Sequence, residues 1–128
     1  MQQQPLRHAA DWFEIPVRNM DRAITFYEAL LATEIRRESI TGSTLGVIKY
    51  HADAGGGALI QSDTAPQPTL DGTLIYLNAG PSLDLALARA EALGARLLTP
   101  KVTLPDGMGC FAHIADTEGN RVGLHALV

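Results

Sequence analysis

The chain has 128 residues, which is the length of one domain with room for a substantial hydrophobic core. With 46% hydrophobic and 19% charged residues, its composition is that of an ordinary globular protein, not a disordered or fibrous one. The net charge of -4 and the scattered lysines and arginines offer no basic surface to phosphates, so we expect no nucleic-acid partner.

The termini and the single cysteine give no sign of secretion or of membrane insertion. Cys110 has no second cysteine to pair with in the chain, and residues 1–7 lack the apolar centre of a signal peptide. No apolar run approaches the roughly 20 residues that a membrane-spanning helix requires. We therefore predict a cytoplasmic protein with no membrane partner.

The first half of the chain is predicted to form a strand, a helix and three more strands. After a loosely ordered lead-in over residues 1–9, residues 11–17 alternate: Phe13, Ile15 and Val17 share one face, and Trp12, Glu14 and Pro16 share the other. Asn19 is a suitable N-cap for a helix over residues 20–31, where apolar side chains recur at helical spacing. The three strands are predicted at 33–40, 44–50 and 57–62.

The second half repeats this order after a linker over residues 63–71, which contains two prolines. A strand is predicted at 73–78 and a helix at 83–93, with Ser82 as N-cap and Gly94 just beyond the helix end. The remaining elements are a strand at 95–99, a loop over 100–107, and a hairpin formed by 109–115 and 120–127. At an offset of 62–63 residues, Trp12 falls on Leu74 and residues 28–32 fall on residues 91–95.

Two stretches of this pattern carry a resemblance to a known family. Residues 17–27 form a strand-to-helix motif, and residues 116–124 form a hairpin that begins Asp-Thr-Glu-Gly. Both resemble motifs of the vicinal oxygen chelate superfamily, which includes glyoxalase I, bleomycin-resistance proteins and extradiol dioxygenases. The closing motif of the family is Asp-Pro-Asp-Gly, so Thr117 stands in the place of proline.

The resemblance implies an α+β fold of two βαβββ modules, whose mixed and curved sheets enclose a cavity with the helices outside. We predict one such domain over residues 1–128, with module one at about 10–62 and module two at about 72–127. Members of the superfamily commonly form homodimers, so a homodimer is expected here too.

The same resemblance argues against the metal site that enzymes of the superfamily typically build from His and Glu side chains on four strands. Its first, third and last positions fall on Trp12, Leu74 and Gly123, none of which can coordinate a metal. The second position falls near residues 58–60, where the nearest donor is the amide of Gln61. We therefore predict no metal at the usual position and no cofactor.

Strand alternation, combined with the resemblance, directs seven side chains toward the predicted cavity. Glu14 and His113 are the candidate acid and base, and the other five are candidate ligand-binding residues. Gly123, which stands where a metal-binding carboxylate is usual, is expected to open space in the cavity. The seven residues are Trp12, Glu14, Tyr76, Asn78, Phe111, His113 and His125.

Three functions remain open at this point. The first is a protein that binds a small organic molecule, aromatic or cationic, in a metal-free cavity. The second is a lyase, isomerase or dioxygenase-type enzyme that uses Glu14 and His113, without a metal or with a metal held by these two residues and His125. The third is an accessory protein whose dimer surface matters more than its cavity. Of these we favour the binding protein, since the usual metal ligands are missing.

Overall fold

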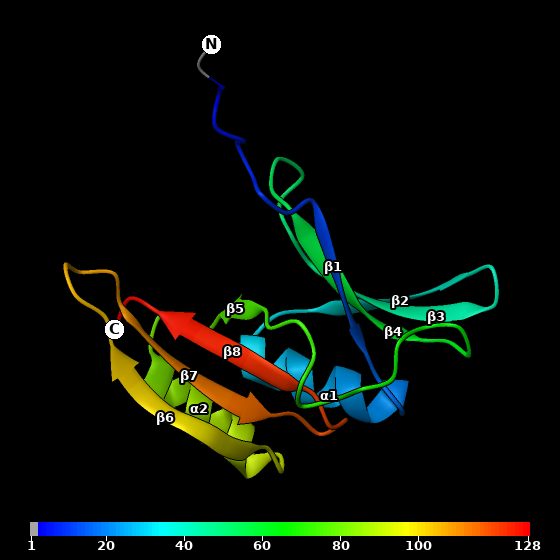
Figure 1. The fold of residues 1–128 in the computed structure, drawn as a ribbon. Coiled ribbons are helices and arrows are strands. Elements are labelled where there is room, and N and C mark those ends of the chain that lie inside the picture. Colours follow the sequence, from blue (N-terminus) through cyan, green and yellow to red (C-terminus); the bar gives the residue numbers. More distant parts are fainter. Residues whose placement is uncertain (1–2) are drawn as a thin grey trace.

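The computed structural model describes residues 3–128, so the first two residues of the predicted lead-in lie outside it. The chain forms two βαβββ modules in succession (Figure 1). The first consists of β1 (Trp12–Pro16), α1 (Met20–Leu31), β2 (Ile35–Ile40), β3 (Ser43–Ile48) and β4 (Gly56–Gln61). The second consists of β5 (Tyr76–Asn78), α2 (Leu83–Ala92), β6 (Arg96–Thr103), β7 (Cys110–Ala115) and β8 (Arg121–Ala126).

Each module carries one mixed four-stranded sheet, and the two sheets have equivalent strand orders. In the first sheet the order is β1-β4-β3-β2, with β1 parallel to β4. In the second the order is β5-β8-β7-β6, with β5 parallel to β8. The predicted α+β fold of two βαβββ modules is therefore confirmed, and the two sheets do not close into a barrel.

The helices begin and end where their capping residues predict. The side chain of Asn19 accepts a hydrogen bond from Arg22 N at 3.0 Å, and that of Ser82 accepts one from Leu85 N at 3.3 Å. Gly94 follows α2 with φ of 98°, a backbone conformation that glycine adopts without strain. At the equivalent place after α1 stands Ala32, with φ of 52°.

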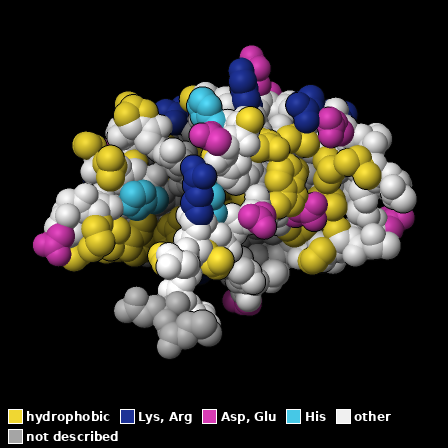
Figure 2. All heavy atoms as spheres, turned by 90° about the horizontal axis from the view of Figure 1, so that it is seen from above, with side chains coloured by type: hydrophobic (Ala, Val, Ile, Leu, Met, Phe, Trp, Pro, Cys, Tyr) yellow, Lys and Arg dark blue, Asp and Glu magenta, His cyan; other side chains and the backbone are white. Residues whose placement is uncertain are grey.

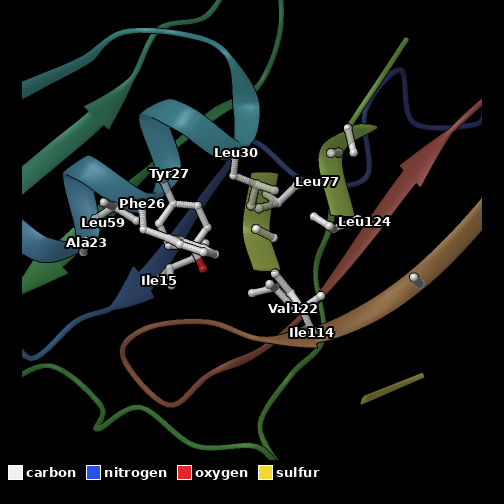
Figure 3. Close-up of a cluster of buried hydrophobic side chains, with 14 of the residues drawn as sticks. Ile15, Ala23, Phe26, Tyr27, Leu30, Leu59, Leu77, Ile114, Val122 and Leu124 are labelled. Atoms are coloured by element: carbon white, nitrogen blue, oxygen red, sulfur yellow. The ribbon is translucent and has the colours of Figure 1, made fainter. Parts of the chain in front are cut away.

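The hydrophobic core lies where both helices pack on the inner faces of both sheets. The two helices lie side by side (Figure 1), and Arg89 of α2 donates hydrogen bonds to the last carbonyls of α1, Ala29 O and Leu30 O. Figure 3 shows side chains of α1 packed between strands of the two modules. Its labelled members are Ile15, Ala23, Phe26, Tyr27, Leu30, Leu59, Leu77, Ile114, Val122 and Leu124, all of them buried.

The strand after α2 differs from its prediction. It continues to Thr103 as β6, whereas the sequence predicts a loop over residues 100–107 because Pro100 cannot donate a backbone hydrogen bond. Since β6 is the outermost strand of its sheet, one side of it needs no donors, and two register irregularities between Leu97 and Val102 accommodate the proline. Conversely, the predicted strand at 73–78 is regular only from Tyr76.

No helix within residues 3–128 combines the length and the apolar character needed to cross a membrane.

Candidate functional site

One face of each sheet packs on the helices, and the opposite face carries the residues that the sequence predicts for the cavity. On β1, Ile15 is buried against α1, so the alternating Trp12 and Glu14 lie on the opposite, exposed face. On β7, Ile114 is buried in the core, so His113 lies on the opposite face and is half buried. We call these opposite faces the open face of the first sheet and the open face of the second sheet.

Three of the predicted residues form one cluster on the open face of the second sheet. The hydroxyl of Tyr76 lies 2.7 Å from His113 Nε2. The ring of Phe111 meets those of Tyr76 and His113 with centroid distances of 5.6 Å in both cases. The strand register causes this meeting, because Tyr76 of β5 and His113 of β7 both lie opposite Gly123 of β8. The cluster is thus set by the pairing of β8 with its two neighbouring strands.

The expectation that Gly123 opens space in the cavity is wrong. A Cβ atom at this position would lie 2.4 Å from the ring of Tyr76, so the ring occupies the space in which a side chain would stand. Tyr76 is the direct neighbour of Gly123 across the parallel strands, and its ring folds over the bare backbone. Glycine therefore serves to seat the tyrosine of the cluster.

Arg121, which was not among the predicted site residues, determines which ring nitrogen of His113 carries the proton. The guanidinium of Arg121 lies 3.1 Å from His113 Nδ1, and Thr99 Oγ1 lies 3.3 Å from the same atom. Because a guanidinium only donates, Nδ1 must accept, which leaves the proton of a neutral imidazole on Nε2. Burial, and then the charge of Arg121, lower the pKa of His113, which favours this neutral form.

The hydrogen bond between His113 and Tyr76 therefore has a direction. The protonated Nε2 donates to the hydroxyl oxygen of Tyr76, and the hydroxyl hydrogen of Tyr76 is left free for another acceptor. The sequence contains a signal for Arg121 but none for Thr99. Arg121 alternates with Gly123 and His125 along β8, whereas Thr99 comes to lie opposite His113 only through the register of β6 and β7.

Asn78 and His125 lie beside this cluster, opposite each other in the sheet, but their side chains hydrogen-bond to backbone atoms of neighbouring loops. The ring nitrogen Nε2 of His125 donates to Met108 O at 2.6 Å, and the side-chain oxygen of Asn78 accepts from Gly80 N at 3.0 Å. These contacts hold the loops at the rim of the open face.

The open face of the first sheet carries a second aromatic group. The indole of Trp12 donates to Glu14 Oε2 at 3.4 Å and meets the ring of Tyr50 edge-on, with a centroid distance of 5.9 Å. Tyr50, which the sequence did not single out, covers Gly56, the strand neighbour of Trp12. A Cβ atom at Gly56 would lie 2.6 Å from the Tyr50 ring. Both open faces thus present an aromatic ring seated on a glycine.

The proposed pairing of Glu14 with His113 is not formed within one chain. Glu14 hydrogen-bonds to Trp12, whereas His113 hydrogen-bonds to Tyr76, Thr99 and Arg121, and the described residues 3–128 show no hydrogen bond between the two. The acid/base pair therefore stays a prediction.

A pocket of about 340 Å³ connects the two modules at this side of the molecule. It extends from the open faces to the end of α1, and its lining residues are Phe13, Leu31, Thr33, Ile48, Lys49, Tyr50, residues 55–57, Tyr76, Leu77 and Asn78. Figure 2 looks onto this side, where hydrophobic side chains gather over both halves of the molecule and charged and histidine side chains lie among them. The arrangement offers aromatic contact surface together with a small number of polar groups, as ligand sites usually do.

Together these features define a protein of paired βαβββ modules with two open, aromatic sheet faces. The model of the Glyoxalase/Bleomycin resistance protein/Dioxygenase superfamily matches residues 9–124. The chain belongs to this superfamily. No curated protein matches the sequence.

Solved structures show the same fold. A glyoxalase/bleomycin resistance protein from Albidiferax ferrireducens T118 is 18% identical, with a TM-score of 0.70 over 93% of this chain and 98% of that one. One from Streptomyces sp. CB03234 is 24% identical, with a TM-score of 0.66 over 89% of this chain and 96% of that one. A fosfomycin resistance protein from Listeria monocytogenes is 16% identical, with a TM-score of 0.62 over 98% of this chain and 92% of that one.

The side chains of one chain do not fit the divalent metal that enzymes of the superfamily typically hold. The resemblance assigns three of the usual ligand positions to Trp12, Leu74 and Gly123, which offer no donor atoms suited to a metal. Among residues 3–128, no three His, Cys, Asp or Glu side chains lie close enough together to hold one ion. This includes the relocated set of Glu14, His113 and His125.

Proposed function

We propose that the protein binds a small organic molecule with a planar aromatic portion on its open sheet faces, in a site without a metal. The observation that carries this proposal is the pair of aromatic groups seated on glycines. The residues Trp12, Tyr50 and Tyr76 are 41%, 48% and 46% exposed, although large rings usually lie largely buried. A planar ligand that covers them gains about 25 cal/mol for each Å² of apolar surface removed from water, besides favourable ring-to-ring contacts.

We further propose that the site is completed in a homodimer. In one chain the two sheets diverge (Figure 1), and each open face meets solvent. A second copy that placed its second sheet over the first sheet would bring Glu14 of one chain toward His113 of the other. This arrangement would also cover the exposed rings. The cytoplasmic location predicted from the sequence stays a prediction.

Binding is favoured over catalysis by the hydrogen bonds of His113. A general base needs an unprotonated nitrogen that faces the substrate. Here Nδ1 is filled by Arg121 and Thr99, and Nε2 carries the proton that it donates to Tyr76. The enzymatic alternative, a lyase or isomerase with Glu14 and His113, would require these bonds to rearrange.

The test is a thermal-shift screen against planar aromatic compounds, followed by titration of each hit. Trp12 is the only tryptophan, so its fluorescence reports directly on the open face of the first sheet. At a ligand concentration of 100 times Kd, we expect a stabilisation of about 2.7 kcal/mol. Tyr50→Ala and Tyr76→Ala should weaken binding, whereas Leu85→Ala, at an exposed position on α2, should not. If no planar aromatic compound raises Tm, the proposed function is wrong.

A further inference from the structure

We infer that the open face of the second sheet is a subsite for an oxygen acceptor, and that the ligand is an aromatic carboxylate or a similar planar oxyanion. The inference rests on the proposed function and adds the chemical class of the ligand. Its central group is the hydroxyl of Tyr76, which donates to the ligand oxygen. Arg121 is the positioning residue that makes Tyr76 a donor.

The first step is a count of hydrogens along three neighbouring side chains. Arg121 Nη1 donates to His113 Nδ1 at 3.1 Å, and a guanidinium has no lone pair with which to accept. His113 must then carry its proton on Nε2, which lies 2.7 Å from the oxygen of Tyr76. The tyrosine oxygen accepts this bond, so its own hydrogen points to a further acceptor. Such a chain polarises the hydroxyl and strengthens the bond that it donates.

The second step concerns charge. Arg121 is half buried, and within residues 3–128 no carboxylate forms an ion pair with it. The acidic partners in the ion pairs of this part of the chain are Asp21, Glu34, Glu38, Asp84 and Glu118, each of which faces another basic side chain. Within one chain the positive charge of Arg121 is therefore not neutralised by a carboxylate. It attracts an anion and repels an ammonium group from the same face.

The third step concerns the body of the ligand. Phe111 stands beside Tyr76 with its ring perpendicular, at a centroid distance of 5.6 Å. Val102, which lies opposite Phe111 in the sheet, is 38% exposed and extends the apolar surface on the same face. A flat ring can lie on this surface while an oxygen at its edge accepts from Tyr76. Aromatic carboxylates combine these two features.

The test compares three probes that share one ring system: 2-naphthoate, 2-naphthylmethylammonium and 2-methylnaphthalene. Each is titrated into the full-length protein at constant ionic strength, and Kd is measured by calorimetry. The structure predicts that 2-naphthoate binds at least tenfold more tightly than the ammonium probe.

Two variants separate the roles of the side chains. Tyr76→Phe keeps the ring over Gly123 but removes the hydroxyl, and should weaken 2-naphthoate about tenfold while leaving 2-methylnaphthalene unchanged. Arg121→Gln keeps a donor for His113 Nδ1 but removes the charge, and should reduce the preference for naphthoate over the ammonium probe. Arg37→Gln makes the same change in net charge beside Asp21 on the first sheet, and should alter neither value.

The outcomes distinguish this inference from the proposed function. If the ammonium probe binds as tightly as 2-naphthoate, or if Tyr76→Phe leaves the affinity for 2-naphthoate unchanged, the oxygen-acceptor subsite is refuted while the aromatic site stands. If none of the three probes binds, the proposed function fails and the subsite with it.

Discussion

Glu118 offers the sharpest test of how the two modules are held together. This residue lies in the turn between β7 and β8, and its side chain is completely buried. It accepts hydrogen bonds from Arg18 N and Asn19 N, both at 2.8 Å, and from Arg22 Nε at 2.7 Å. Burial alone would raise the pKa of Glu118, but the hydrogen bonds from Arg22, Asn19 and Arg18 outweigh it and lower the pKa.

We expect Glu118→Gln to destabilise the protein by about 2–3 kcal/mol. Bonds to an ionised group contribute about 1.5–3 kcal/mol each, but the amide oxygen of glutamine keeps part of them. Arg22 is 50% exposed, so water can solvate it once the charge is lost. For a chain of this length the loss corresponds to a fall in Tm of about 7–11 °C.

The measurement is urea unfolding at neutral pH, followed by circular dichroism. Glu38→Gln is the matched control, because Glu38 and its partner Arg36 are 40% and 69% exposed and their pair should contribute less than about 0.5 kcal/mol. Because the pKa of Glu118 is lower in the folded state, the unfolded state binds more protons in acid. The difference in free energy of unfolding between wild type and Glu118→Gln should therefore be largest above the ordinary carboxyl pKa. It should vanish as the pH falls through the pKa of Glu118 in the folded state. Equal stability of wild type and variant at neutral pH would refute this account.

Three further predictions concern Gly123, Ala32 and His113. Gly123→Ala should displace the ring of Tyr76, and urea unfolding should show a loss of about 1–3 kcal/mol in stability. Titration should show weaker binding of planar ligands. If stability and affinity are both unchanged, the ring of Tyr76 does not depend on the glycine. Ala32→Gly should stabilise by about 0.5–1 kcal/mol in urea unfolding, because φ is 52° there; a loss of stability would contradict it. In NMR titrations His113 should show a lowered pKa that rises in Arg121→Gln, and an unchanged pKa would argue against the contact with Arg121.

The elements of the fold were predictable because their signals are local. Asn19 and Ser82 cap helices whose apolar side chains recur at helical spacing, and both helices begin where these residues predict. The extent of β6 was not predictable in the same way. Pro100 signals the end of a strand, and only the position of β6 at the sheet edge, a property of the whole topology, makes the proline tolerable.

For the candidate site, the sequence predicts on which sheet face a side chain lies, but not which other side chains it contacts. Alternation along a strand is enough to place Trp12 with Glu14 on the face opposite Ile15. Which side chain meets which depends on pairing between segments far apart in sequence, as with Tyr76 of β5 and His113 of β7, which meet because both strands pair with β8. The contact of Tyr50 with Gly56 was not predictable, because the strand predicted at 44–50 ends at Ile48 and strand alternation therefore does not place the ring of Tyr50.

The turn that carries Glu118 also determines when the protein can become folded during its synthesis. Asp116 accepts a hydrogen bond from Tyr27 of α1 at 2.5 Å, and Asn120 donates to Pro16 O at 2.8 Å, so the turn completes the first module. On the ribosome this turn emerges 99 residues after Asn19, because synthesis runs from the N-terminus. The backbone N–H groups of Arg18 and Asn19, just before α1, therefore lack the carboxylate that accepts from them until the hairpin of β7 and β8 is available. The two modules share one topology, but these contacts make them fold as one unit.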